Sequence, residues 1–184
     1  MSNEINYGPL AALIGVWQGD KGMDVSPSPK GSDDTPYHET LTFSAIGDVG
    51  NAQKQTLSVL RYHQVVQRKA NDEVFHDEIG YWMFDPKTEV IMHSLTIPRG
   101  VCVLAGGKSR ATENGGVVLE VAASVDDKDW QIVQSPFMRD NARTTEFRHK
   151  ITVENGKLSY SETMILDIYG KTFDHTDENE LIIQ

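Results

Sequence analysis

Histidine is the residue type in this sequence best suited to hold a metal or a cofactor, because its imidazole ligates transition metals and titrates near neutral pH. No two histidines stand at HxH or HxxxH spacing, and the single cysteine, Cys102, is not placed to complete a short motif with them. The common short-spacing zinc motifs are therefore absent, and a histidine site requires the fold to bring distant strands together. The six histidines are His38, His63, His76, His93, His149 and His175.

Three of these histidines share the face of a predicted strand with apolar residues. His93 alternates with Ile91 and Leu95, and the pattern around His149 is similar. His175 is also in phase with apolar residues, although the polar run TDENE follows it. Burying an imidazole without a partner costs about 1–3 kcal/mol, so an inward histidine requires a hydrogen-bond partner or a ligand. His93 and His149 are accordingly candidate ligand-binding residues, with a structural, hydrogen-bonded histidine as the alternative.

One arginine and several carboxylates extend the set of candidates. Arg61 alternates with Val59 and His63, so an inward Arg61 would meet the carboxylate of a ligand, and His63 would lie beside it. The alternative for Arg61 is an ion pair with one of the many acidic side chains. Three carboxylates stand in mid-strand beside apolar residues and are candidate buried bases or hydrogen-bond partners: Glu39, Glu78 and Glu162.

The composition limits the classes of function. The chain has 184 residues and a net charge of −10, which argues against nucleic-acid and anionic-membrane partners. One cysteine excludes an internal disulfide and suits a reducing compartment. No signal-peptide pattern or membrane-spanning apolar run is visible, so we expect a cytoplasmic protein with one domain over residues 1–184. P-loop, GxSxG, GxGxxG and CxxC motifs are absent, which favours a binding protein over an enzyme.

The elements that must position these residues are predicted to be strands. Polar and apolar residues alternate along most of the chain, and the turn signals DPKT, PRG, ENGG, DDKD and ENGK separate the runs. This pattern predicts an all-β fold of ten or eleven short antiparallel strands. A meander of that length exposes two edges unless it closes, so we predict a single closed antiparallel β-barrel of about ten strands over a two-sheet sandwich. The polar stretch at 26–36, SPSPKGSDDTP, is predicted to be a long loop between the first two strands.

The N-terminal stretch LAALIGVWQGDKG is predicted to close one end of this barrel. Leu10 to Ile14 form a short helical plug, and Gly15 turns the chain into a first strand that carries Trp17 inward. A barrel of this size is too wide for its own side chains to fill and commonly holds a small ligand. Trp17 is therefore included among the candidate ligand-binding residues.

The same stretch resembles the GxWxGxG signature of the nitrobindin-like heme-binding β-barrels, a family related in shape to the calycins and fatty-acid-binding proteins. PYHETLTFSAIG, LRYHQVV, FHDEIGYW, MHSLTIPRGVCVLAGG and RHKITVENGKLSYSETM resemble further segments of that family in the expected order. The resemblance implies a ten-stranded barrel with a largely apolar cavity. It also implies heme as a cofactor, bound by a histidine of the last strand, with nitric oxide binding or peroxynitrite isomerisation as the activity.

The last strand departs from the family pattern. When NELIIQ is placed over it, Asn179 stands where the heme-ligating histidine belongs, and asparagine is not a useful ligand of heme iron. His175 lies four residues earlier, about 13 Å away in an extended strand, and is the candidate heme-iron ligand. The alternatives are ligation by another histidine such as His93, or a ligand other than heme.

Three hypotheses follow for the function. The first is an intracellular barrel that binds a small hydrophobic or amphipathic ligand, with heme as the leading named candidate and a fatty-acid or lipid carrier without heme as its variant. The second is an enzyme, either a heme-dependent peroxynitrite isomerase or a catalyst that uses a buried His/Glu pair. The third is a scaffold whose barrel is filled by its own aromatic side chains.

Overall fold

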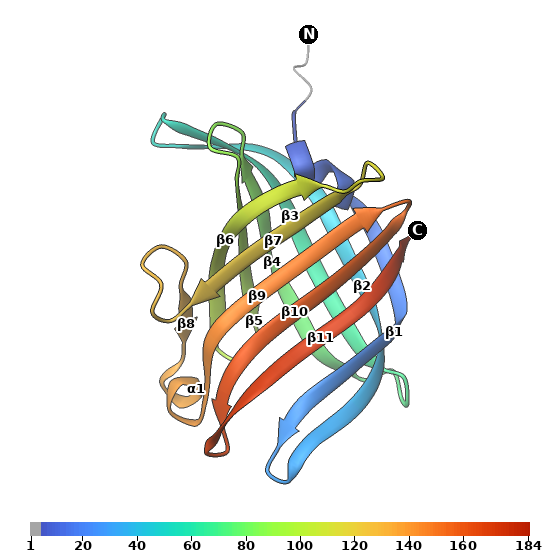
Figure 1. Cartoon of the computed structure of the whole chain (residues 1–184), viewed down its shortest axis with the longest axis vertical. Helices are drawn as coiled ribbons and strands as arrows, with labels where there is room; N and C mark the ends of the chain where they lie inside the picture. The colour runs from blue at the N-terminus through green and yellow to red at the C-terminus, as the bar shows by residue number, and fades with distance from the viewer. Residues whose placement is uncertain (1–4) are drawn as a thin grey trace.

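The computed structural model describes residues 5–184, which form strands and two short helices (Figure 1). The 3-10 helix η1 spans Gly8–Leu13, and the α-helix α1 spans Pro136–Asn141. The strands are β1 (Gly15–Ser28), β2 (Gly31–Asn51), β3 (Gln55–Arg68), β4 (Val74–Asp85), β5 (Val90–Ile97), β6 (Val101–Ala111), β7 (Val117–Ser124), β8 (Ile132–Gln134), β9 (Ala142–Glu154), β10 (Lys157–Ile168) and β11 (Lys171–Ile183).

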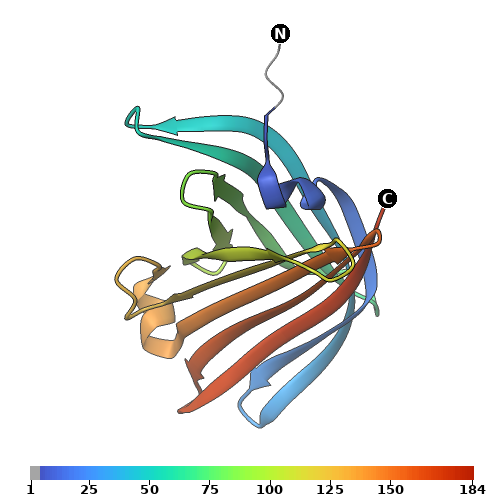
Figure 2. The same cartoon turned by 45° about the horizontal axis from the view of Figure 1, so that its top comes forward.

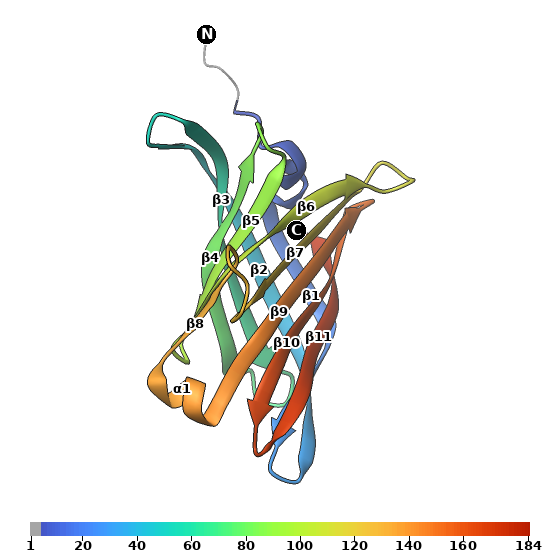
Figure 3. The same cartoon turned by 60° about the vertical axis from the view of Figure 1, so that its left-hand side comes forward.

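Ten of these strands close into an antiparallel barrel, which confirms the predicted fold class. The hydrogen-bonded order is β5-β4-β3-β2-β1-β11-β10-β9-β7-β6, and a direct β5–β6 pairing closes the ring. The short β8 pairs only with the start of β6 and adds an eleventh strand outside the ring. Turned views show the strands curving around a common axis, with η1 at one end and α1 at the other (Figures 2 and 3). Closure removes the free edges that a flat meander would expose.

The predicted plug is present as a 3-10 helix at one mouth of the barrel. Leu10 and Leu13 are fully buried against the core, and Pro9 stands at the start of the helix, where its missing N–H is not needed. Trp17 is 2 % exposed and its indole Nε1–H donates to the Leu13 carbonyl at 2.7 Å. The first strand and the plug are therefore held together by one buried hydrogen bond.

Two polar stretches form strands, and the prediction of a loop at 26–36 is wrong. The stretch at 26–36 is not a loop, because β1 and β2 continue through it as a long hairpin with only two residues, 29 and 30, in the turn. Its side chains are half-buried or exposed, so a polar sequence is compatible with pairing there. The polar run TDENE likewise stays within β11, where it pairs residue by residue with β10. In both places backbone pairing outweighs low apolar content.

The seam between β1 and β11 is paired at one end only. Trp17 and Gln18 pair with Ile183 and Ile182, and no further pair joins the two strands within the described chain. Beyond a register shift between Gly19 and Gly22, the β1–β2 hairpin diverges from the β10–β11 hairpin (Figure 1). The backbones of β1 and β11 are thus unpaired along the α1 half of this seam, which we call the open seam, and side chains bridge it there.

The two halves of the barrel have different interiors. The hydrophobic core lies toward η1 and includes Phe43, Trp82, Ile91 and Phe147, all at most 2 % exposed. Toward α1 the interior is hollow, and polar side chains enter it beside apolar ones such as Ile97 and Val101. No helix in residues 5–184 is long and apolar enough to cross a membrane.

Candidate functional site

A cavity of about 710 Å³ occupies the α1 half of the barrel. One side of it is apolar and is formed by Met164, Leu166 and Ile168 of β10 together with Phe137 and Met138 of α1. These inward positions of β10 alternate with outward ones, as the period of a strand requires. The polar side chains of the lining are Asp24, Ser26, Gln64, Arg68, His76, Arg99, Thr144, Glu162, His175 and Asp177, with the hydroxyl groups of Tyr37, Tyr160 and Tyr169.

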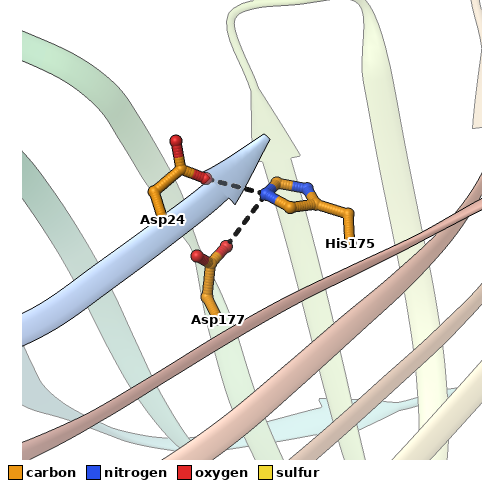
Figure 4. A group of neighbouring side chains, drawn as sticks. All are labelled: Asp24, His175 and Asp177. Atoms are coloured by element: carbon orange, nitrogen blue, oxygen red, sulfur yellow. Dashed lines mark hydrogen bonds and ion pairs between the residues drawn. The ribbon is translucent and has the colours of Figure 1, made fainter. Parts of the chain in front are cut away.

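Three polar residues of the lining converge across the open β1–β11 seam (Figure 4). His175 Nε2 lies 2.8 Å from Asp24 Oδ1 and 3.4 Å from Asp177 Oδ2. Asp24 comes from β1, whereas His175 and Asp177 are alternate residues of β11 that face the same way. We call Asp24, His175 and Asp177 the seam triad. Its three ligand atoms all lie within 4.8 Å of one another, so one small cation could contact all three.

The electrostatics of the seam triad favour positive charge at its centre. Burial lowers the pKa of His175, but the hydrogen bond to Asp24 and the charges of both carboxylates outweigh it, so its pKa is raised. Burial raises the pKa of Asp177 to about 6, with His175 opposing the shift. Ionised carboxylates only accept hydrogen bonds, so the proton of the Asp24 contact belongs to His175 Nε2.

A hydrogen-bond network beside the cavity fixes Asn179. Its Nδ2 donates to Glu39 Oε1 at 2.8 Å, while Gln64 donates to Glu39 Oε2 at 2.8 Å. The Tyr160 hydroxyl lies 3.1 Å from the same Oε2 and 3.0 Å from the Tyr37 hydroxyl. Burial raises the pKa of Glu39 despite these partners. Asn179 therefore serves to orient a buried carboxyl group.

A second polar cluster lies deeper, against the hydrophobic core. His93 is fully buried and stacks on Trp82 with ring centroids 4.2 Å apart, and neither of its ring nitrogens has a hydrogen-bond partner among residues 5–184. Desolvation lowers its pKa well below the usual value. His149, whose burial lowers its pKa to about 4, has Nδ1 3.0 Å from Glu162 Oε2, without the alignment of a hydrogen bond.

Glu162 connects this cluster to the cavity, which it lines. Burial, followed by the charge of Glu78, raises the pKa of Glu162 well above its usual value. A raised pKa favours the protonated form of a carboxyl group, and that form can donate a hydrogen bond to a guest molecule. The His/Glu pair considered in the sequence therefore exists as His149 and Glu162, with Glu162 accessible from the cavity.

The structure separates the residues that the sequence singled out. His175 lines the cavity, whereas Trp17, His93 and His149 are buried in the core and are not part of its lining. Arg61 and His63 lie on the outer face of β3, contrary to their predicted inward orientation, and His63 contacts Asp77 there at 3.1 Å. At this end of β3 both faces are apolar, so alternation with Leu57 and Val59 does not identify the inner face. The inward residues are Tyr62 and Gln64, one position out of phase.

Comparisons with known proteins identify a family and a similar solved structure for this barrel. A family model described as "THAP4-like, heme-binding beta-barrel domain" matches residues 6–182. The crystal structure of Rv2717c from M. tuberculosis is similar, with a TM-score of 0.71 and 23 % sequence identity over 95 % of this chain and 94 % of that one. No curated protein matches the chain. The structural similarity supports the fold, and the family match extends over nearly the full length.

Proposed function

Because this chain belongs to the THAP4-like heme-binding β-barrel family, we propose that it is a ligand-binding barrel that takes an amphipathic small molecule into the cavity beside α1. The observation that carries the proposal is the two-sided lining of that cavity. Met164, Leu166 and Ile168 offer an apolar wall, and the seam triad with Glu162 offers a polar, acidic end.

The size and charge of the cavity favour this function over the alternatives. A barrel filled by its own side chains would leave far less than the 300 Å³ or so that a small-ligand pocket requires, whereas this cavity measures about 710 Å³. A fatty acid whose carboxylate entered the seam triad would meet the carboxylates of Asp24 and Asp177, which would repel it. Of the two lining arginines, Arg68 donates to Thr35 and pairs with Glu73, whereas Arg99 donates to the Phe75 carbonyl. Neither forms an ion pair with the seam triad. The polar end therefore suits a neutral or cationic group.

Heme, the group for which the family is named, does not fit the residues at this cavity. The residue in the family's histidine register, Asn179, is hydrogen-bonded to Glu39 and offers the iron no useful ligand. His175 lines the cavity, but its Nε2, the atom that would bind iron, is already held by Asp24 and Asp177. We therefore derive no activity through heme, peroxynitrite isomerisation included.

A neutral solvatochromic dye such as Nile red tests binding in the cavity, because its emission rises and shifts to the blue in an apolar pocket. Leu166→Trp fills part of the cavity from β10, and Ile165→Trp places the same side chain on the outer face of the same strand. We expect Leu166→Trp to weaken dye binding by at least tenfold and Ile165→Trp to leave it unchanged. Equal binding by both variants would contradict the proposal.

Added hemin provides the second arm of the same experiment. Because Asn179 offers no useful ligand and His175 Nε2 is held by Asp24 and Asp177, we expect wild-type protein to leave the spectrum of free hemin without the Soret band of a histidine-ligated ferric heme. A Soret band that appears with wild type and disappears in His175→Gln would show that the seam triad opens to release His175, and heme would then be the guest.

A further inference from the structure

Several carboxyl groups of the α1 half have no lysine or arginine paired directly with them among residues 5–184. Five carboxylates lie in or beside the cavity: Asp24, Glu39, Glu78, Glu162 and Asp177. Among residues 5–184, no lysine or arginine lies within ion-pair distance of any of them, and their only basic neighbours within 4.0 Å are histidines. Buried carboxylates are normally paired with cations or bound to metals. Arg68 and Arg99 also line this cavity but lie beyond ion-pair distance of these five groups, so histidine is the only basic side chain that contacts them directly among residues 5–184.

The seam triad is the place where a cation would find ready ligands. Asp177 Oδ1 is buried and has no hydrogen-bond partner among the described residues, so this carboxylate has unused acceptor capacity. Asp24 is only 8 % exposed, and its Oδ1 and Asp177 Oδ2 approach the same nitrogen of His175 from two strands. Two carboxylates around one imidazole leave a net negative charge even when the imidazole is protonated.

The spacing of the three atoms suits a transition-metal ion. Ligands about 2.0–2.2 Å from a tetrahedral zinc ion lie about 3.3–3.6 Å from one another. The observed separations of 2.8 and 3.4 Å, with all three atoms within 4.8 Å, differ from those values by side-chain adjustments only. One imidazole with two carboxylates is a ligand set for Zn²⁺, Fe²⁺ or Mn²⁺ more than for Ca²⁺ or Mg²⁺, which prefer oxygen alone.

We propose that Asp24, His175 and Asp177 bind a divalent transition-metal ion, which replaces the Nε2 proton of His175 and bridges the open seam between β1 and β11. All three residues line the cavity, so the remaining coordination position faces the cavity and any guest within it. Three protein ligands with one open position is the arrangement of zinc sites that bind a further molecule. The bound ion would also join the two hairpins where the backbone does not pair.

The groups that surround the seam triad from other strands are compatible with this role. Tyr37 of β2, His76 of β4 and Glu162 of β10 line the same cavity, and Arg99 reaches it from the turn between β5 and β6. The Glu162 carboxyl group could approach the remaining coordination position of the ion. His76 is instead directed to Glu78, with 3.6 Å between His76 Nε2 and Glu78 Oε2. The proposal shares its cavity with the proposed function but does not depend on an organic guest.

Titration of the full-length, EDTA-treated protein with Zn²⁺ by isothermal calorimetry tests the site. We expect one ion per chain in wild type and at least tenfold weaker binding in each of Asp24→Asn, Asp177→Asn and His175→Gln. In thermal unfolding, Zn²⁺ at a hundredfold excess over Kd should raise the midpoint of wild type by about 5–10 °C. The matched control is His63→Gln with Asp77→Asn, a histidine–carboxylate pair on the outer face that lacks a third ligand. This double variant should bind Zn²⁺ as wild type does.

Co²⁺ adds a readout that loss of stability alone would not produce, because its visible d–d absorption reports an ordered site of low coordination number. We expect those bands in wild type and in the outer-face control, and their loss in Asp24→Asn. Far-UV circular dichroism confirms that each variant is folded, and the two aspartate variants serve as independent tests. Absence of binding in folded wild type, or binding that survives in all three seam variants, would overturn the proposal. Nile red binding measured without metal distinguishes that failure from failure of the proposed function.

Discussion

Replacing His149 should change how the stability of the barrel depends on pH. His149 is 8 % exposed, and burial lowers its pKa to about 4, against about 6.5 in an unfolded chain. Between these values the unfolded chain binds a proton that the folded chain does not, so the free energy of unfolding falls as the pH falls. At about 1.4 kcal/mol for each pKa unit, the full effect is about 3 kcal/mol, of which about 2 kcal/mol is lost between pH 7 and pH 4.5.

Urea unfolding followed by tryptophan fluorescence at pH 7 and pH 4.5 measures this difference. We expect His149→Gln to lose about 2 kcal/mol less than wild type over that interval, because glutamine does not titrate. Buried carboxyl groups with raised pKa, such as Glu39, act in the opposite direction, but they do so in both proteins. Ile151→Val, at an inward core position of the same strand, should cost about 0.5–1.5 kcal/mol equally at both pH values. A wild type and a His149→Gln variant with parallel pH profiles would refute the assignment of a neutral, buried imidazole.

Two further predictions concern the first strand. Trp17→Phe removes the hydrogen-bond donor to the Leu13 carbonyl and should lower the free energy of unfolding in urea at pH 7 by about 1–3 kcal/mol. An unchanged unfolding midpoint would mean that η1 is held by packing alone. Gly22→Ala should be destabilising by about 1–3 kcal/mol, because a Cβ there would lie 2.0 Å from the buried ring of Tyr37. Gly50→Ala, with open space around the new Cβ, is its control and should unfold within about 0.5 kcal/mol of wild type; equal effects of the two changes would contradict the packing at Gly22.

The barrel could be predicted from the sequence because its determinants are local. The alternation of polar and apolar residues and the tight polar turns define the strands, and the large number of strands favours closure into a barrel. The helical plug was predicted from the apolar run Leu10 to Ile14, which precedes Gly15. The hairpin at 26–36 was missed because prolines and aspartates rarely occur in strands. In the structure they occupy a solvated hairpin that diverges from the barrel, where pairing does not require apolar side chains.

The cavity residues were harder to predict because their proximity depends on strand register and on the open seam. His175 was found from its strand phase, but Asp24 lies 151 residues away and stands in a polar stretch without a recognisable motif. Asp177 was hidden within TDENE, although its two-residue spacing from His175 on one strand face was a usable signal. Arg61 and His63 were misplaced because both faces of β3 are apolar near Leu57 and Val59, so the phase alone was ambiguous.

The central claim is that a guest lies inside the α1 half of the barrel, between the apolar wall of β10 and the seam triad. Methyl ¹H–¹³C NMR spectra recorded during titration with Nile red test it most directly. The account predicts that the inward Met164, Leu166 and Ile168 methyl signals shift while the outward signals of Ile165 and Ile182 stay in place. Shifts confined to Ile165 and Ile182 would place the guest on the outer surface and contradict the account.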